Sequence, residues 1–131
     1  MSHLKNKSND LIAAAKLLDV SKLYPAVAHS AYYCCILLMK QIWLHSLHKT
    51  ESDLTMQLTS TKKGTHEFLI NQIGIHIKSC NTKDFLIFNR NIVQLKRLRV
   101  NADYLDNAFG MKESNSSLTL SNLIVPILQK Y

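Results

Sequence analysis

The sequence predicts an all-α fold, an up-and-down bundle of four to five helices. Only 3 glycines and 2 prolines occur in 131 residues, so the residues that break helices most strongly are scarce. Apolar residues recur at intervals of three and four along five separate stretches, whereas no stretch alternates as a strand does. The length is that of one domain, and we treat residues 1–131 as a single helical domain.

The first two helices are marked by a cap and by a proline. Either Ser8 or Asn9 can cap the first helix, which ends near Leu18. The second and longest helix covers about residues 21–47, with Pro25 in its first turn, where proline is tolerated. Its middle is apolar nearly all round, which predicts a central position in the bundle.

Polar stretches separate the remaining helices. Residues 49–63 lack firm periodicity and are predicted to form a loop. Thr65 can cap a third helix, and a fourth spans about residues 82–108, with Gly110 after it as a C-terminal glycine. A polar break at residues 114–117 precedes the last helix, about 118–129, in which Pro126 marks a kink or an early end. The apolar second and fourth helices fit either a dimer seam or a filled monomer core.

Charge and composition limit the function classes. Lysine and arginine number 16 against 9 acidic residues, and the net charge of +7 with a pI near 9.4 fits an anionic partner such as nucleic acid. Only Arg90, Arg97 and Arg99 can supply a planar guanidinium. The three cysteines match neither a disulfide framework nor a zinc pattern, so we expect reduced thiols in the core.

Several classes are excluded by absent patterns. The longest apolar stretch, residues 31–44, is too short to span a membrane, and no secretory signal is visible, so we expect a cytoplasmic protein without a membrane partner. There is no glycine-rich phosphate loop, nucleophile elbow or cysteine with a recognisable partner. These absences exclude P-loop enzymes, dinucleotide enzymes and the usual hydrolases, and no cofactor is expected.

The richest polar cluster lies in the fourth helix. Lys96, Arg99 and Asp103 share one face, where Arg99 can bind a phosphate while Asp103 orients it. Tyr104 offers a hydroxyl or a stacking face, and Asn101 lies nearby. The alternative is a solvated ion pair between helix neighbours and a tyrosine packed in the core.

The six histidines follow no metal-binding pattern, and no metal site is expected. His45 and His48 are three apart without a third ligand, so we place them at a helix end as partners of the helix dipole. His29 and Tyr33 can face the same cavity as Arg99 if the second and fourth helices are neighbours. The alternative is a buried hydrogen bond between that histidine and a tyrosine.

A second phosphate candidate is the start of the third helix. His66 stands where free backbone N–H groups bind anions, directly after Gly64 and Thr65, with Lys62 and Lys63 just before them. The alternative is a solvated, capped helix end.

Three motifs in this order resemble the HEPN family (higher eukaryotes and prokaryotes nucleotide-binding). They are residues 24–34 (YPAVAHSAYYC), residues 63–66 (KGTH) and residues 98–104 (LRVNADY). The resemblance covers about residues 11–128 and implies a bundle of four to five helices, often a homodimer, in small stand-alone bacterial proteins. It also implies toxin–antitoxin, defence or RNA-processing roles, with a nucleotidyltransferase as partner.

Many HEPN proteins are metal-independent endoribonucleases with an arginine followed, after four to six residues, by histidine. That motif is absent here, because His76 is the last histidine and Arg99 meets Tyr104 at the corresponding spacing. Tyrosine, with a pKa near 10, is a poor acid or base at neutral pH. His66 or His29 can replace the missing group only if folding brings one of them to Arg99.

Three functional hypotheses follow. The leading one is an RNA- or nucleotide-binding HEPN-type protein that uses a groove containing residues of the three motifs: Arg99, Asp103, Tyr104, Asn101, Lys96, His66, Lys63, His29 and Tyr33. The second is a metal-independent endoribonuclease in which Arg99 stabilises phosphate charge and a histidine such as His66 transfers a proton. The third is a structural interaction module.

Overall fold

A computed structural model describes residues 3–61 and 64–131, and all of its regular structure is helical. The elements are α1 (His3–Val20), α2 (Tyr24–Gln41), the π-helical turn η1 (Ile42–Ser46), α3 (Glu51–Thr61), α4 (Thr65–Cys80), α5 (Thr82–Tyr104) and α6 (Met111–Leu128). The predicted all-α bundle is confirmed, although it has six α-helices rather than four to five.

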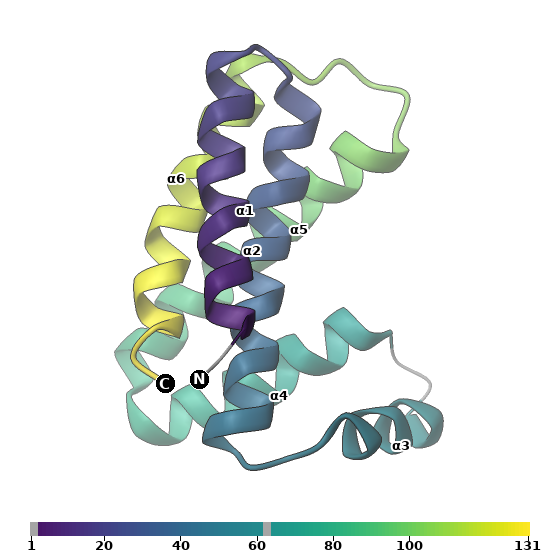
Figure 1. Cartoon of the computed structure of the whole chain (residues 1–131), viewed down its shortest axis with the longest axis vertical. Helices are drawn as coiled ribbons and strands as arrows, with labels where there is room; N and C mark the ends of the chain where they lie inside the picture. Colours follow the sequence, from purple (N-terminus) through teal and green to yellow (C-terminus); the bar gives the residue numbers. More distant parts are fainter. Residues whose placement is uncertain (1–2, 62–63) are drawn as a thin grey trace.

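Helix α2 is the centre of the bundle, as its apolar middle predicts. It packs against α1, α6 and α5, and it also contacts α4. In Figure 1, α1 and α2 run side by side along the long axis, while α3 projects from the lower end. Tyr32, Met39 and Val27 of α2 are fully buried together with Phe88 and Ile92 of α5. The core therefore joins the two helices that carry most of the candidate residues.

The second helix is shorter at both ends than predicted. It begins at Tyr24 with Pro25 in its first turn, as expected, and it ends at Gln41, where the π-helical turn follows. The Leu47 amide donates to the Ile42 carbonyl at 2.9 Å, a five-residue spacing that widens the turn. Trp43 is buried in this turn. The wide turn thereby ends α2 and leads the chain toward α3.

The loop predicted at residues 49–63 is wrong, because residues 51–61 form α3. The Asp53 amide donates to Thr50 Oγ1 at 3.0 Å, and the Thr50 amide donates to the Asp53 carboxylate at 2.8 Å. This reciprocal capping box satisfies two backbone donors and starts the helix without a long apolar stripe. Leu54 is the buried anchor of α3. Lys62 and Lys63 lie outside the described residues.

The first helix is not capped at Ser8 or Asn9, because α1 already begins at His3. Ser8 is buried inside the helix, where its hydroxyl donates to the Lys5 carbonyl at 2.9 Å. A serine whose hydroxyl bonds back to the preceding turn is tolerated in a helix interior. Ser8 is therefore an interior residue of α1 and not its N-cap.

Both glycines expected at helix boundaries take a different role. Gly64, and not Thr65, is the N-cap of α4, with Thr65 as the first helical residue. Helix α5 ends at Tyr104, before the predicted residue 108, and Gly110 is the N-cap of α6 rather than a C-terminal glycine. The Gly110 amide donates to Glu113 Oε2 at 2.9 Å, which closes the first turn of α6.

The polar break predicted at residues 114–117 is wrong, since these residues belong to α6. Ser114, Ser117 and Ser121 are fully buried, and each hydroxyl has a hydrogen-bond acceptor. Ser114 Oγ donates to Asp19 Oδ1 at 2.6 Å and so joins α6 to α1. Small side chains with satisfied hydroxyls let α6 approach the bundle closely. Pro126 lies in the last turns of α6, close to its end.

Two of the three free cysteines behave as predicted. Cys34 and Cys35 are buried, and burial raises the pKa of the Cys34 thiol to about 11. Cys80 is exposed at the end of α4, so the prediction of a core position is wrong for it. None of the described helices has the length and apolar character needed to cross a membrane.

The turn between α1 and α2 contains a strained residue, and this gives a stability prediction. Lys22 has a φ of 62°, while the Leu23 amide donates to the Leu18 carbonyl at 2.9 Å, the pattern of a Schellman motif. A side chain in the left-handed region costs about 1 kcal/mol that glycine avoids. Glycine also loosens the unfolded chain, which offsets part of this gain, so we expect Lys22→Gly to raise the free energy of unfolding by about 0.5–1 kcal/mol. Urea unfolding measures this, and a destabilised variant would contradict it.

Candidate functional site

The candidate site is built around Arg99, a cation held inside the bundle. Arg99 lies on α5 with only 7% of its surface exposed, and its Cζ stands 4.9 Å, 5.7 Å and 5.5 Å from the ring centres of Tyr32, Tyr33 and Tyr104. Aromatic faces attract a guanidinium through the ring quadrupole. Two consecutive tyrosines of α2 and one of α5 thus fix the position of this charge.

The hydrogen bonds of Arg99 leave part of its donor capacity unused. Its Nη1 donates to Tyr104 Oη at 3.3 Å, and the same nitrogen lies 3.7 Å from Asp103 Oδ2. Its Nε–H is buried and has no acceptor among the described residues. An unsatisfied buried donor is costly, and an arginine fork prefers an anion with two acceptor oxygens. The guanidinium is therefore preorganised but not neutralised by a close, two-pronged partner.

His66 adjoins this cation from the start of α4. Tyr32 Oη lies 3.2 Å from His66 Nδ1. Burial raises the pKa of Tyr32 to about 12, although Arg99 opposes the shift, so the phenol keeps its proton. Burial, followed by the charges of Arg99 and Lys96, holds the pKa of His66 below its usual 6.5. We therefore assign Tyr32 as donor to a neutral His66, whose Nε2 then carries the remaining ring proton.

His29 of α2 joins the same cluster through Asp103 and Tyr33. Its Nδ1 lies 2.9 Å from Asp103 Oδ2, and its side chain is 51% exposed. Because a carboxylate only accepts, Nδ1 donates this hydrogen bond, and Nε2 is the ring nitrogen left to accept one when the ring carries a single proton. Tyr33 contacts both histidines, with ring centres 4.7 Å from His29 and 5.3 Å from His66. One histidine can thus donate and the other accept near one arginine.

A hollow of about 330 Å³ opens at the beginning of α4. Its lining residues come from two segments: Gly64, Thr65, His66 and Glu67 of the α4 start, and Lys96 and Arg99 of α5. Gly64 is the N-cap of α4, and no side chain among residues 3–61 and 64–131 caps this helix, so its first-turn amides can face an anion. The dipole of α4, Lys96 and Arg99 all favour an anion in this space. We call this space the phosphate hollow.

Among the described residues of the predicted site, most come together and Asn101 is the exception. Arg99, Asp103, Tyr104, His29, Tyr33, His66 and Lys96 form one cluster through the contacts above or line the phosphate hollow. Asn101 has a buried Oδ1 without a donor among the described residues and does not line the hollow. Lys63 cannot be placed because it lies outside the described residues.

The exposed fractions of the side chains decide between the alternative interpretations of this cluster. Arg99 is not part of a solvated ion pair between helix neighbours, because its side chain is nearly inaccessible. Tyr104 is not a core tyrosine, since 72% of its surface is exposed. His29 is half-exposed and bonds to Asp103, and so the alternative of a buried histidine–tyrosine bond applies to His66 and Tyr32 instead.

Tyr32 is the functional candidate that sequence reasoning did not select. It is fully buried and contacts both Arg99 and His66. The available signal was its place beside Tyr33: consecutive residues on a helix point about 100° apart, so two adjacent tyrosines can enclose one cation.

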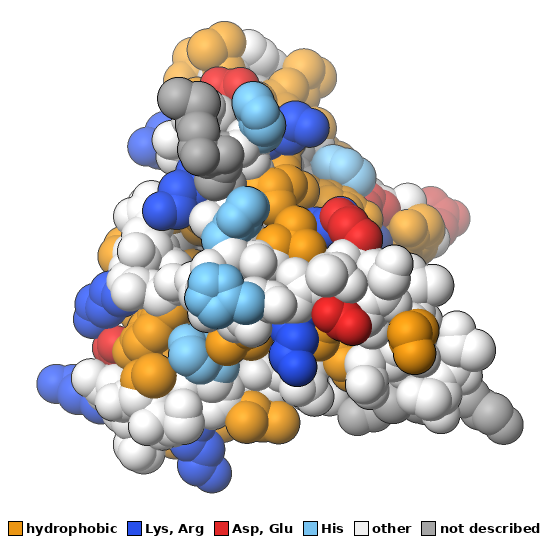
Figure 2. All heavy atoms as spheres, turned by 60° about the horizontal axis from the view of Figure 1, so that its bottom comes forward, with side chains coloured by type: hydrophobic (Ala, Val, Ile, Leu, Met, Phe, Trp, Pro, Cys, Tyr) orange, Lys and Arg blue, Asp and Glu red, His pale blue; other side chains and the backbone are white. Residues whose placement is uncertain are grey.

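The remaining histidines are spread over the surface. Figure 2 turns the lower end of the Figure 1 view toward the reader. Histidine side chains form a broken band across this end, and lysine and arginine side chains lie at the margins of the band. His45 lies in the last turn of η1, as the dipole interpretation expects, whereas His48 follows it with a φ of 55°. Within residues 3–61 and 64–131, no group of three histidine, cysteine or acidic residues could hold a metal.

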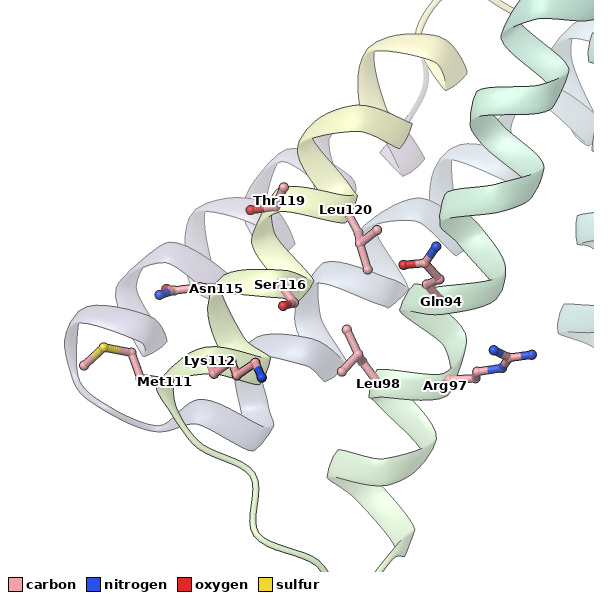
Figure 3. A pocket seen from close by; sticks show the side chains of 9 residues that line it. All are labelled: Gln94, Arg97, Leu98, Met111, Lys112, Asn115, Ser116, Thr119 and Leu120. Atoms are coloured by element: carbon pink, nitrogen blue, oxygen red, sulfur yellow. The ribbon is translucent and has the colours of Figure 1, made fainter.

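A larger hollow lies elsewhere, between α5 and α6. It measures about 940 Å³, with Leu98 and Leu120 as apolar wall residues (Figure 3). Arg97 lies at its edge, and in Figure 3 its guanidinium extends away from α6. This hollow contains no buried charge, so its size alone does not make it the chemical centre of the molecule.

Comparison of the chain with protein-family models, with curated proteins and with solved structures found no match.

Proposed function

We propose that this protein binds RNA or a nucleotide through a phosphate group held at the phosphate hollow. The observation that carries the proposal is Arg99, a nine-tenths buried arginine whose Nε–H has no acceptor in the described part of the chain, beside a helix N-terminus that no described side chain caps. Lys96 adds a second cation to the same hollow. A phosphate supplies the acceptor oxygens that these donors lack.

The charge balance and the sequence motifs support the same ligand. A net charge of +7 attracts polyanions, and Arg99 lies in the motif at residues 98–104 that resembles the HEPN family. The other two motifs supply Tyr32, Tyr33 and His66, which contact Arg99 or line the hollow. The proposal is thus an HEPN-type nucleotide- or RNA-binding protein, with a role in toxin–antitoxin or defence systems as the wider implication.

The first prediction concerns Arg99. We expect Arg99→Ala to lower affinity for a short RNA oligonucleotide about tenfold and to reduce the slope of log affinity against log salt by about one, because one phosphate contact is lost. Arg90→Ala is the matched control, since it removes an exposed arginine from the same helix away from the hollow. Titrations at two salt concentrations measure both effects.

Because Arg99 is buried, its removal also tests folding. Thermal melts of each variant separate lost binding from lost structure, and Lys96→Ala provides a milder change in the same hollow. Reduced binding by folded Arg99→Ala and Lys96→Ala supports the proposal. A wild-type protein that binds no RNA or nucleotide, while Arg99→Ala merely melts earlier, would instead identify a structural interaction module.

The second prediction concerns pH. His66 has a pKa below 6.5 and is neutral at pH 7.5, so lowering the pH adds a positive charge beside the bound phosphodiester. The affinity for RNA is expected to rise as the pH falls from 7.5 to 5. The affinity of the His66→Gln variant should rise less over the same range. In the free protein the same depressed pKa has the opposite effect, because stability falls as the pH drops below 6.5. Identical pH profiles for wild type and His66→Gln would refute a role for His66.

A second function, metal-independent endoribonuclease, is favoured by the two histidines that adjoin Arg99. RNA cleavage requires one group to take the proton of the ribose 2′-hydroxyl and another to give a proton to the leaving oxygen. In its neutral form His29, held by Asp103, has an accepting Nε2 that can take the hydroxyl proton, and His66, held beside Tyr32, can give a proton to the leaving oxygen from Nε2 once its own ring is protonated. Arg99 can stabilise the phosphate charge between these steps.

The third prediction tests this chemistry. If the histidines act as acid and base, wild type cleaves RNA in the presence of EDTA and leaves a 2′,3′-cyclic phosphate. His29→Ala and Arg99→Ala would then each lose at least about a hundredfold in rate, because general acid–base catalysis contributes about 10²–10⁴-fold. His76→Ala is the control, since that histidine lies apart from the cluster beside Tyr131. Binding without cleavage would leave the protein as a binding module.

A further inference from the structure

A groove leads away from the phosphate hollow along the line between α4 and α5. A second hollow of about 510 Å³ shares Glu67 and Lys96 with the phosphate hollow. A third hollow of about 370 Å³ shares Ile70, Asn71 and Asn89 with the second. Because each hollow shares wall residues with the next, the three lie in a row between α4 and α5, and we call this row the α4–α5 groove.

We propose that single-stranded RNA lies along the α4–α5 groove, with one phosphate in the phosphate hollow and the following nucleotides extending toward Lys78. This inference rests on the proposed function and adds the class, direction and length of the ligand. A free mononucleotide has the same chemistry but would occupy only one end of the groove.

The dimensions of the groove fit several nucleotides. His66 lines its first hollow and Lys78 its third, and these residues are 12 positions apart on α4. Twelve helical residues rise about 18 Å. Stacked nucleotides rise about 3.4 Å each, so the groove can hold about five of them, or fewer in an extended strand.

The walls of the groove suit bases as well as phosphates. Val93 is 41% exposed and Ile75 is 63% exposed, and these side chains offer apolar surface to the faces of bases. The ring of Phe85 lines the third hollow. Asn71 and Asn89 are exposed amides that can donate to or accept from base edges. Apolar surface beside cations is the pattern of sequence-tolerant binding to single strands.

The close approach of α4 and α5 sets the depth of the third hollow. Gly74 lies there, and a Cβ atom at this position would stand 3.4 Å from Phe85 Cε1 and 3.8 Å from Phe88 Cε2. These are ordinary van der Waals distances, so only a side chain that extends beyond Cβ would press on the aromatic rings. The absent side chain keeps this end of the groove open.

The charges along the groove favour a polyanion. Lys78, Lys96 and Arg97 line it, against a single acidic residue, Glu67, among the described lining residues. Glu67 stands at the junction of the first two hollows, where the sugar after the bound phosphate would lie. A carboxylate accepts hydrogen bonds from ribose hydroxyls, as it does in dinucleotide-binding proteins, and this favours RNA over DNA.

The test compares ligand length and groove charge in the full chain. Affinities are measured for uridine monophosphate, diuridylate, hexauridylate, an abasic hexamer and a hexaglutamate peptide. The groove variant is Asn89→Asp, which places a negative charge where the second and third hollows meet. The control is Gln94→Glu, which makes the same change of charge on α5 but faces the hollow beside α6.

The expected result is that hexauridylate binds at least about tenfold more tightly than diuridylate and than the abasic hexamer, since each stacked base adds affinity. Asn89→Asp should weaken hexauridylate binding about fivefold and leave diuridylate unchanged, whereas Gln94→Glu should change neither. Equal affinities for the long and short RNA ligands would overturn the inference. Equal binding of hexaglutamate, or equal effects of the two variants, would also overturn it.

Failure of the groove can be told apart from failure of the phosphate site. If Arg99→Ala weakens diuridylate binding but length has no effect, the proposed function stands and the groove inference is wrong. If Arg99→Ala changes the affinity for no ligand, the proposed function itself fails, and with it the groove.

Discussion

The burial of Arg99 against three tyrosine rings is the constraint on which the candidate site depends. A guanidinium cannot lose its proton at any ordinary pH, so the fold must hold a permanent charge within a largely apolar bundle. Tyr32, Tyr33 and Tyr104 supply aromatic faces, while Asp103 supplies a carboxylate at 3.7 Å. None of these partners satisfies the Nε–H, and the remaining donor capacity is what an incoming phosphate would use. The arrangement therefore leaves part of the cost of burying this charge uncompensated in the free protein.

The same contacts organise the surroundings of the cation. Tyr32 holds His66 at the start of α4, and Asp103 holds His29 on α2, so two histidines are oriented by partners that also contact Arg99. Helix α4 then brings its uncapped N-terminus to the same place, because it packs along α5 at Gly74. The binding proposed at the phosphate hollow and along the α4–α5 groove would thus depend on one packing arrangement. Whether the histidines only bind or also transfer protons is a separate question, which the cleavage products answer.

Helical periodicity predicted the fold class and most of the site, but it failed where capping decided the boundaries. The spacing of Lys96, Arg99 and Asp103 placed them on one face correctly, yet it could not indicate that Arg99 is buried, because burial depends on the neighbouring helix. The reciprocal hydrogen bonds of Thr50 and Asp53 start a helix in a stretch without clear periodicity. The serines of α6 predicted a polar break, but they are buried inside the helix. The approach of His29 and His66 to Arg99 joins three distant segments, which no local pattern contains. The homodimer and the nucleotidyltransferase partner stay predictions of the HEPN resemblance.

The most direct test of the phosphate site is a nitrogen-15 NMR titration of the arginine side chains with hexauridylate. The chain has only three arginines, Arg90, Arg97 and Arg99, so the Nε–H region of the spectrum is simple to assign by single substitution. Because the Nε–H of Arg99 has no acceptor among the described residues, its signal should shift as an oxygen approaches, and the shift should saturate with added ligand. The exposed Arg90 should shift little. A titration in which RNA moves Arg90 as much as Arg99, or in which Arg99 does not respond while RNA binds, would contradict the account.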